Sequence, residues 1–181
     1  LDDTLTDANT FAADVLVHAV RGHGRTLSAE TVRRHPGAPY VPLLQRELAL
    51  DLEAAQAIYA DYVQRYRETM AAALRERTGA TPLLRTLAAR GARIGLVSNK
   101  LEGLAREILA QFGWAGWFGA VVGQDTCEYR KPHPGIVHHA LDAVQGDVAH
   151  AAFVGDTPSD MQCARDAGVP LVVGQIGRAH V

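Results

Sequence analysis

The sequence is poor in cysteine and has no strong charge of either sign. Only Cys127 and Cys163 are present among 181 residues, and their arrangement offers neither a zinc-site spacing nor a disulfide framework. Both are interpreted as packing or surface thiols. The net charge is −2 at pH 7, and no run of Lys and Arg is longer than a dipeptide. Such a chain lacks the basic surface that holds nucleic acid by its phosphates, so no nucleic-acid partner is expected.

Long apolar stretches are also missing. No apolar run approaches the roughly 20 residues that a helix needs to cross a bilayer. The N-terminus shows no basic segment followed by the apolar core of a signal peptide. No membrane partner is therefore expected, and the cytoplasm is the predicted location. With 48% hydrophobic residues, the chain can bury one substantial core and one smaller core.

The first part of the chain has helical periodicity throughout. Apolar residues recur three and four positions apart from about Asp7 to Thr78, which predicts an all-helical region of about 70 residues. One stripe in this region is rich in aromatic residues and is predicted to be core or domain interface. It contains Tyr59, Tyr62, Val63 and Tyr66.

After Gly79 the pattern changes to alternating helices and strands. The segment 81–91 has Thr81 as a candidate N-cap, Pro82 at the first helical position and Gly91 at the end. Strands apolar enough to be buried on both faces indicate a parallel sheet with helices on both sides. The expected strands are 93–98, 119–123, 151–155 and 170–174, and the expected later helices are 101–113, 134–144 and 158–168.

Polar residues follow each of these strands. In parallel sheets, ligands bind beyond the carboxyl ends of the strands. Ser98, Asn99 and Lys100 come directly after the first expected strand, and Asp156 after the third. Asp160 lies four positions further on, across a turn that contains Pro158. The sequence therefore predicts that a hydroxyl group, an ammonium group and two carboxylates meet at one edge of the sheet.

These groups match a site that binds a phosphoryl group. Two carboxylates facing one pocket repel each other, and a bound divalent cation relieves that repulsion. Oxygen ligands of this kind favour magnesium, which also shares its ligand shell with a substrate phosphate. Ser98 could offer its hydroxyl group to a phosphate oxygen, and Lys131 could present a positive charge to the same anion. Each residue alone has a plainer interpretation as a helix cap or solvated surface group, but together they favour phosphoryl chemistry.

Four motifs give the sequence a resemblance to a known family. "LDDTL", "GLVSNK", "RKPHP" and "FVGDTPSDMQCARDAG" resemble, in order and spacing, the motifs of haloacid-dehalogenase-like phosphohydrolases with a C1 helical cap. The resemblance implies an α/β fold with a three-layer, Rossmann-like parallel sheet and an inserted all-helical cap. It implies a discontinuous core of residues 1–7 and 80–174, and a cap of residues 8–79.

The first motif is incomplete in this sequence. The family's pattern is an Asp nucleophile, any residue, and a second Asp that serves as acid and base. The resemblance places Leu1 between the two and Asp2 in the second position, so the nucleophile and the first core strand would precede Leu1. A competing register makes Asp2 the nucleophile and Thr4 the acid/base position. In a third interpretation, Asp2 and Asp3 merely begin a polar tail. Residues 175–181, which include "IGRAHV", are interpreted as a non-native tail.

The resemblance also implies roles for the site residues. Asp2 and Lys131 are the expected catalytic residues, and Ser98, Asn99 and Lys131 are expected to bind phosphate. The expected cofactor is Mg²⁺, held by Asp2 through its backbone carbonyl and by Asp156, while Asp160 would act through water or from outside the ligand shell.

The stretch "VVGQDTCEYRKPHP" is similar to phosphoglycolate phosphatases, so the expected partner is a small phosphorylated metabolite, with 2-phosphoglycolate as first choice. Pyrophosphatase, sugar or nucleotide phosphatase and phosphoglucomutase activities are alternatives on the same scaffold. Another alternative is that the 181-residue chain by itself is an inactive fragment or a binding module. A monomer or a homodimer is expected.

Overall fold

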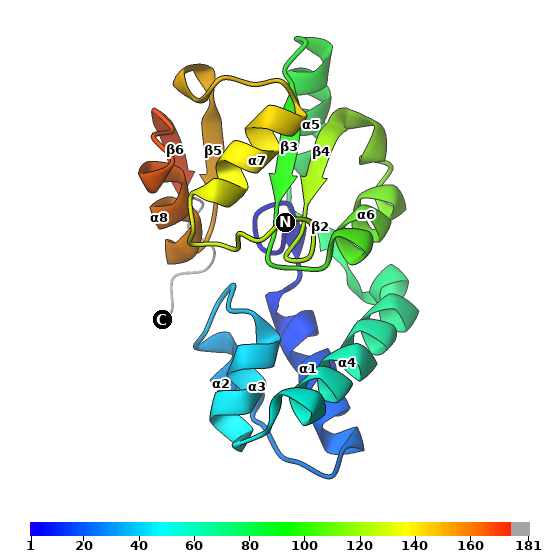
Figure 1. The fold of residues 1–181 in the computed structure, drawn as a ribbon. Helices are drawn as coiled ribbons and strands as arrows, with labels where there is room; N and C mark the ends of the chain where they lie inside the picture. The colour runs from blue at the N-terminus through cyan, green and yellow to red at the C-terminus, as the bar shows by residue number, and fades with distance from the viewer. Residues whose placement is uncertain (175–181) are drawn as a thin grey trace. The chain divides into compact units, whose positions relative to one another are not determined.

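The computed structural model describes residues 1–174, apart from the side chain of Asn9. The predicted tail at 175–181 lies outside the described residues. The chain divides into two compact units (Figure 1). One contains Leu1–Thr6 together with the chain from Glu76 onward, and the other contains Asp7–Arg75. The chain passes between the units through two short strands that pair with each other, β1 (Thr6–Asp7) and β2 (Arg75–Glu76).

The unit Asp7–Arg75 consists of helices. They are α1 (Asn9–Gly22), α2 (Ala29–Arg33), α3 (Tyr40–Leu48) and α4 (Leu52–Ala73). Helix α4 packs against α1 and α3, and α2 packs against α1. The side chain of Asp51 caps α4 by accepting a hydrogen bond from the backbone N–H of Ala54, which satisfies a donor that the first helical turn leaves unpaired.

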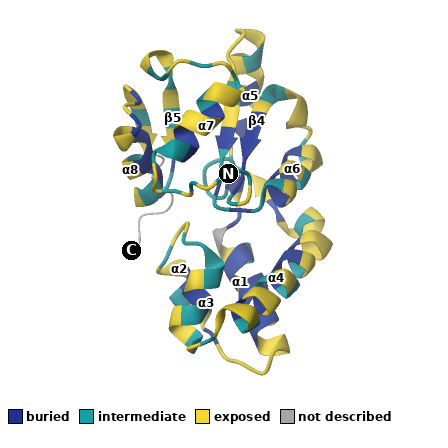
Figure 2. Ribbon diagram, in the orientation of Figure 1, coloured by how far each residue is buried: buried dark blue, intermediate teal, exposed yellow. Residues whose placement is uncertain are grey.

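Tyrosines of α4 are part of the core of this helical unit. Tyr62 and Tyr66 are fully buried, and Figure 2 shows the buried side of α4 and α1. The ring centroids of Tyr62 and Tyr40 are 5.0 Å apart, and those of Tyr66 and Phe11 are 4.8 Å apart. Such tilted and edge-on contacts are favourable for aromatic rings. The predicted stripe along α4 is confirmed as core.

The second unit alternates strands with helices, as predicted. A cluster of buried residues from β4, α7 and α8 forms part of its core, and it includes Val122, Ile136 and Cys163. The strands are β3 (Ile94–Val97), β4 (Phe118–Val122), β5 (Ala152–Gly155) and β6 (Leu171–Gly174). The helices are α5 (Ala80–Ala89), α6 (Glu102–Gln111), α7 (Gly135–Ala143) and α8 (Pro158–Asp166), with short 3₁₀ turns at Ala115–Trp117 and Val148–His150.

The start of α5 differs from the prediction. The helix begins at Ala80, and its N-cap is Gly79, whose φ of +92° suits the absence of a side chain. Thr81 therefore lies inside the helix and does not cap it. Its Oγ1 instead accepts a hydrogen bond of 2.8 Å from the indole Nε1 of Trp114, which is fully buried and stacks on Phe112. A tertiary contact thus takes the hydroxyl group that the sequence pattern assigned to a cap.

The strands are parallel but do not form one continuous sheet. Strand β3 pairs with β4, and β5 pairs with β6, and within residues 1–174 each pair is a separate two-stranded sheet. The predicted burial on both faces holds for Val121 and Val122 of β4. It is wrong for β5 and β6, where Val154, Leu171 and Val173 are 48%, 56% and 43% exposed. The reason is that α8 packs against these two strands, and the described residues do not cover their other apolar positions.

Candidate active site

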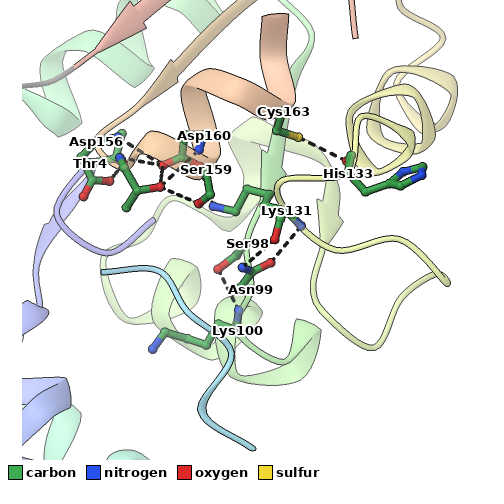
Figure 3. Close-up of polar contacts among 11 residues, drawn as sticks. Thr4, Ser98, Asn99, Lys100, Lys131, His133, Asp156, Ser159, Asp160 and Cys163 are labelled. Atoms are coloured by element: carbon green, nitrogen blue, oxygen red, sulfur yellow. Dashed lines mark hydrogen bonds and ion pairs between the residues drawn. The ribbon is translucent and has the colours of Figure 1, made fainter. Parts of the chain in front are cut away.

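The predicted site residues meet at the carboxyl ends of the strands of the α/β unit. Ser98 directly follows β3, Lys131 lies in the loop after β4, and Asp156 directly follows β5 (Figure 3). Within each strand pair, parallel pairing puts the two carboxyl ends at the same edge, and the contact of Lys131 with Asp160 joins the two pairs. The structure therefore brings Asp156, Asp160 and Lys131 close to the N-terminal residues, as the following contacts show.

Ser98 is held by the end of the strand pair. Its backbone N–H donates to the carbonyl of Val122, at 2.9 Å, and so continues the pairing of β3 with β4. Its side chain is buried, and Oγ accepts a hydrogen bond from the backbone N–H of Lys100 at 3.1 Å. The hydroxyl group keeps its own proton as a donor, which suits an anionic oxygen.

Asn99 joins the β3 end to the loop that carries Lys131. Its Oδ1 accepts from the backbone N–H of Lys131 at 3.2 Å, and its Nδ2 donates to the carbonyl of Lys131 at 3.4 Å. The amide side chain therefore positions the backbone of Lys131. Direct contact of Asn99 with phosphate stays a prediction.

Lys131 and Asp160 form a buried ion pair. The Nζ of Lys131 is 2.6 Å from Oδ1 of Asp160, and the two side chains are 9% and 4% exposed. Burial alone would raise the pKa of Asp160, but the charge and hydrogen bond of Lys131, with hydrogen bonds from Thr157, bring the pKa below its ordinary value of 3.8. The lysine is thus held in one orientation by a carboxylate that stays ionised.

The second oxygen of Asp160 fixes the start of α8. Oδ2 accepts from the backbone N–H of Thr157 at 3.0 Å and from that of Asp156 at 3.2 Å, while Thr157 Oγ1 caps the N–H of Asp160 in return. This is a capping box with Asp at the third position. Both oxygens of Asp160 therefore have partners within the protein, and its predicted role toward a metal stays a prediction.

Asp156 is half-buried beside the N-terminal residues. Its Oδ1 accepts a hydrogen bond of 2.7 Å from Thr4 Oγ1. Burial is the main cause that raises the pKa of Asp156, and the negative charges of Asp160 and Asp3 add to it. The hydrogen bond from Thr4 opposes this shift without cancelling it. A carboxylate in such surroundings gains from a nearby cation.

Asp2 and Leu1 lie inside this site. The Oδ2 of Asp2 is 2.9 Å from Nζ of Lys100, and Oδ1 is buried without a hydrogen-bond partner in the described part of the chain. Leu1 is buried, and its backbone nitrogen lies close enough to Lys131 and to the three carboxylates of Asp2, Asp160 and Asp156 for their charges to act on it. The backbone at Leu1 is therefore close to the carboxylates of β5 and α8 and to Lys131.

The donor set fits a magnesium ion. Asp156 is close enough to Asp160 and Asp3 for their negative charges to act on it, and Lys131 is paired with Asp160. The raised pKa of Asp156 marks a carboxylate whose negative charge the described residues do not fully offset. Among residues 1–174 no group of three His, Cys, Asp or Glu side chains is gathered closely enough to hold a metal alone. Magnesium is compatible with this, because it binds through one or two carboxylates and keeps waters and substrate oxygens as its other ligands.

Two site residues were not among the predicted ones. Lys100 was visible only as a lysine in the polar run after β3, and Thr4 only as an alternative register of the first motif. Their contacts with Asp2 and Asp156 depend on segments far apart in the sequence. By contrast, the expectation of inert thiols agrees with the site: burial raises the pKa of the Cys163 thiol to about 11, and its Sγ donates to the carbonyl of His133.

The ion pair of Asp160 leads to a prediction on stability and pH. The pKa of Asp160 is lower in the folded protein than its ordinary value of 3.8, so the stabilisation is present above that value and is lost as pH falls below it. Asp160→Asn is expected to lower the free energy of unfolding by about 3 kcal/mol at pH 7, because it leaves Lys131 buried and unpaired. Urea unfolding of both proteins between pH 7 and 3 measures the difference, which should shrink below about pH 4.

Asp166→Asn is the matched control, because Asp166 is an exposed aspartate at the end of the same helix. It should change the free energy of unfolding by less than about 0.5 kcal/mol. An Asp160→Asn difference that stays constant down to pH 3 would mean that the ionised carboxylate does not stabilise the fold.

Comparison with known proteins agrees with this geometry. The family model for haloacid dehalogenase-like hydrolases matches residues 1–173. The chain belongs to this family. The predicted family is thereby confirmed, and the match covers both compact units.

Relatives within the family carry two kinds of name. A phosphoglycolate phosphatase from Rhodospirillum rubrum is 41% identical over 127 residues, which are 70% of this chain and 53% of that protein. One from Xylella fastidiosa is 36% identical over 72% of this chain and 58% of its own length. A protein from Caldanaerobacter subterraneus that carries the name pyrophosphatase is 31% identical over 95% of this chain and 77% of its own length. The chain thus spans a little over half the length of the two phosphoglycolate phosphatases.

Solved structures of the family have the same fold. A haloacid dehalogenase-like protein from Bacteroides fragilis superposes with a TM-score of 0.87 at 22% identity, over 99% of this chain and 87% of that one. A hydrolase from Pseudomonas syringae superposes with a TM-score of 0.79 at 21% identity, over 96% and 81%. The predicted α/β class with parallel strands is confirmed. Within the described residues, no helix is both long and apolar enough to cross a bilayer.

Proposed function

We propose that a protein containing this chain hydrolyses a small phosphomonoester with the help of Mg²⁺. The observation that carries the proposal is the meeting, at the carboxyl ends of the strands, of Ser98, a buried Lys131 held by Asp160, and the carboxylates of Asp156 and Asp2. A fixed cation beside hydroxyl and carboxylate groups is the arrangement that phosphoryl transfer needs.

Ser98 and Lys131 bind the transferring phosphoryl group in this proposal. The Ser98 hydroxyl group donates to one phosphoryl oxygen. The Lys131 ammonium group, which Asp160 already orients, offsets the negative charge between substrate and nucleophile. Because Lys131 is positioned before substrate arrives, little reorganisation accompanies the reaction.

Asp2 exchanges the proton. The nucleophile in this proposal is a carboxylate at the position before Leu1. The backbone of Leu1 lies near Lys131, Asp156 and Asp160. That carboxylate attacks phosphorus, the ester bond breaks, and Asp2 gives its proton to the leaving oxygen. Asp2 then takes a proton from the water that hydrolyses the aspartyl-phosphate. Thr4 holds Asp156 in place throughout.

Asp156 and the backbone carbonyl of Asp2 are the proposed protein ligands of the metal. The ion would draw negative charge from the phosphoryl oxygens and reduce repulsion between substrate and carboxylates. The helical residues 8–79 are proposed to act as the family's cap, which selects the substrate.

A phosphorylated two-carbon acid, 2-phosphoglycolate, is the first proposed substrate. It is supported by the names of the relatives from Rhodospirillum rubrum and Xylella fastidiosa. Inorganic pyrophosphate is the second candidate, because the relative from Caldanaerobacter subterraneus that carries the pyrophosphatase name matches a larger part of this chain.

Phosphate release from chains with different N-termini tests the proposal. The 181-residue chain is compared with two extended forms, which add an apolar strand ending in Asp or in Asn directly before Leu1. Each is assayed on 2-phosphoglycolate, pyrophosphate, a sugar phosphate and a nucleotide, with Mg²⁺ and with EDTA. Only the form ending in Asp is expected to release phosphate, only with Mg²⁺, and fastest from 2-phosphoglycolate.

The form ending in Asn is the matched control, because it restores the strand without the nucleophile. If all three forms fold and none releases phosphate, the hydrolase proposal is wrong. Release by the unextended chain would instead identify Asp2 as the nucleophile.

A further inference from the structure

Lys100 is a buried lysine that the proposed chemistry does not use. Its side chain is 6% exposed, and its Nζ lies 2.9 Å from Oδ2 of Asp2. Removing an ammonium group from water is costly unless a charged partner compensates it. Figure 3 shows the side chain of Lys100 apart from that of Lys131, which pairs with Asp160. The two lysines therefore serve two different carboxylates.

The backbone of Lys100 is held on both sides. Its N–H donates to Ser98 Oγ at 3.1 Å, and its carbonyl accepts from the N–H of Gln124 at 2.9 Å. A Cβ atom at Gly123 would come within 2.7 Å of that carbonyl, so only glycine lets the two segments approach this closely. The backbone of Lys100 is thus hydrogen-bonded to residues that follow β3 and β4, and these contacts fix the point from which its side chain extends.

The segment that carries Asp2 is a tight loop. The carbonyl of Leu1 accepts from the N–H groups of Leu5 and Thr6, and the N–H of Asp3 donates to the carbonyl of Thr6 at 2.7 Å. Asp3 has a φ of +54°, a conformation that an aspartate tolerates better than most residues. This loop fixes the backbone of Asp2, and the orientation of its side chain depends on the contacts of its two oxygens.

The two oxygens of Asp2 have different surroundings. Lys100 holds Oδ2, whereas Oδ1 is buried and has no hydrogen-bond partner in residues 1–174. The ion pair at Oδ2 therefore fixes the orientation of the Asp2 carboxylate and leaves Oδ1 without a competing partner among the described residues. The unpaired oxygen is the one that can take or give a proton.

We propose that Lys100 is a positioning residue that orients Asp2 for proton transfer to the leaving group. The inference rests on the proposed function, because it assigns a support to the proposed acid and base. Lys100 acts through Asp2 and does not touch the phosphoryl group. The ion pair with Oδ2 fixes the side-chain torsion of Asp2, so Oδ1 remains available for the proton. A lysine with a merely structural role would affect every substrate alike.

Substrates with different leaving groups separate these roles. The leaving group of 4-nitrophenyl phosphate departs without a proton, whereas that of 2-phosphoglycolate needs one. In the phosphate-releasing form, Lys100→Met should lower kcat/KM for 2-phosphoglycolate about 30-fold, within the range that general acid catalysis contributes. The same variant should lower kcat/KM for 4-nitrophenyl phosphate less than about threefold, since orientation of the acid matters little there. Lys100→Arg should recover part of the loss.

Arg93→Met is the matched control, because Arg93 is an exposed cation just before the opposite end of β3. It should leave kcat/KM for both substrates unchanged. Equal losses on the two substrates for Lys100→Met would overturn the inference and assign Lys100 a structural role. If the unsubstituted form hydrolyses neither substrate, the proposed function fails, and the inference that depends on it fails too.

Discussion

In the extended form that ends in Asp before Leu1, Lys131→Met is expected to lower phosphate release by about 100-fold or more and to destabilise the fold by about 3–5 kcal/mol. The rate falls because the ammonium group that offsets phosphoryl charge is lost, and removal of one such group costs about two to three orders of magnitude. The fold weakens because Asp160, 4% exposed and 2.6 Å from Nζ, loses its partner while its charge stays buried. Steady-state kinetics and urea unfolding measure the two effects separately.

The double variant Lys131→Met with Asp160→Asn is the control for this pair. It removes both charges, so most of the stability should return, whereas the activity should not. Recovery of activity in the double variant would show that Lys131 only neutralises Asp160. Full stability of Lys131→Met alone would show that the ion pair contributes nothing to the fold.

Gly155→Ala is expected to have the second-largest effect, through the geometry of the same carboxylate. A Cβ atom at position 155 would lie 2.5 Å from Cβ and 2.7 Å from Cγ of Asp160, closer than atoms can pack. The start of α8 must therefore shift, which should cost about 1–3 kcal/mol. Because Asp160 orients Lys131, a displacement of about 1 Å should also lower phosphate release by the extended form that ends in Asp, by up to about 100-fold. Thermal unfolding and phosphate release measure both consequences.

Gly174→Ala is a closely matched control, because Gly174 is the residue paired with Gly155 across β5 and β6. Among residues 1–174, a Cβ atom there would meet only the flexible Sδ of Met161, at 3.4 Å. It should change the free energy of unfolding by less than about 0.5 kcal/mol. If both alanine variants behave like the unsubstituted chain, α8 can move without disturbing Asp160, and the close approach at Gly155 is not needed.

Periodicity and strand order were enough to predict much of the fold. The aromatic residues of α4 recur at helical spacing, and polar residues directly follow β3 and β5. Both features can be recognised within a short stretch of sequence. Local sequence patterns were insufficient where a residue far away in the sequence binds the same side chain. The Thr81 hydroxyl group pairs with Trp114, 33 positions away, and so is not a cap. The strands form two separate pairs, β3 with β4 and β5 with β6. Which strands pair cannot be predicted from their apolar residues alone.

The candidate site divides in the same way. Ser98, Lys131, Asp156 and Asp160 follow strands and could be placed at one edge from the chain order alone. The pairing of Asp2 with Lys100 could not, because it depends on the loop of residues 1–6 and on the close approach at Gly123. The use of Asn99 to hold the Lys131 backbone is equally invisible in the sequence, since an amide after a strand suits either a ligand or a loop.

The distribution of aromatic side chains gives each compact unit its own optical signal. Both tryptophans, Trp114 and Trp117, belong to the α/β unit, whereas four of the five tyrosines belong to the helical unit. Fluorescence excited at the red edge of the tryptophan band therefore reports on the α/β unit alone. Absorbance changes of the packed tyrosines report mainly on the helical unit. A single unlabelled sample can thus reveal whether the two units melt together or one after the other.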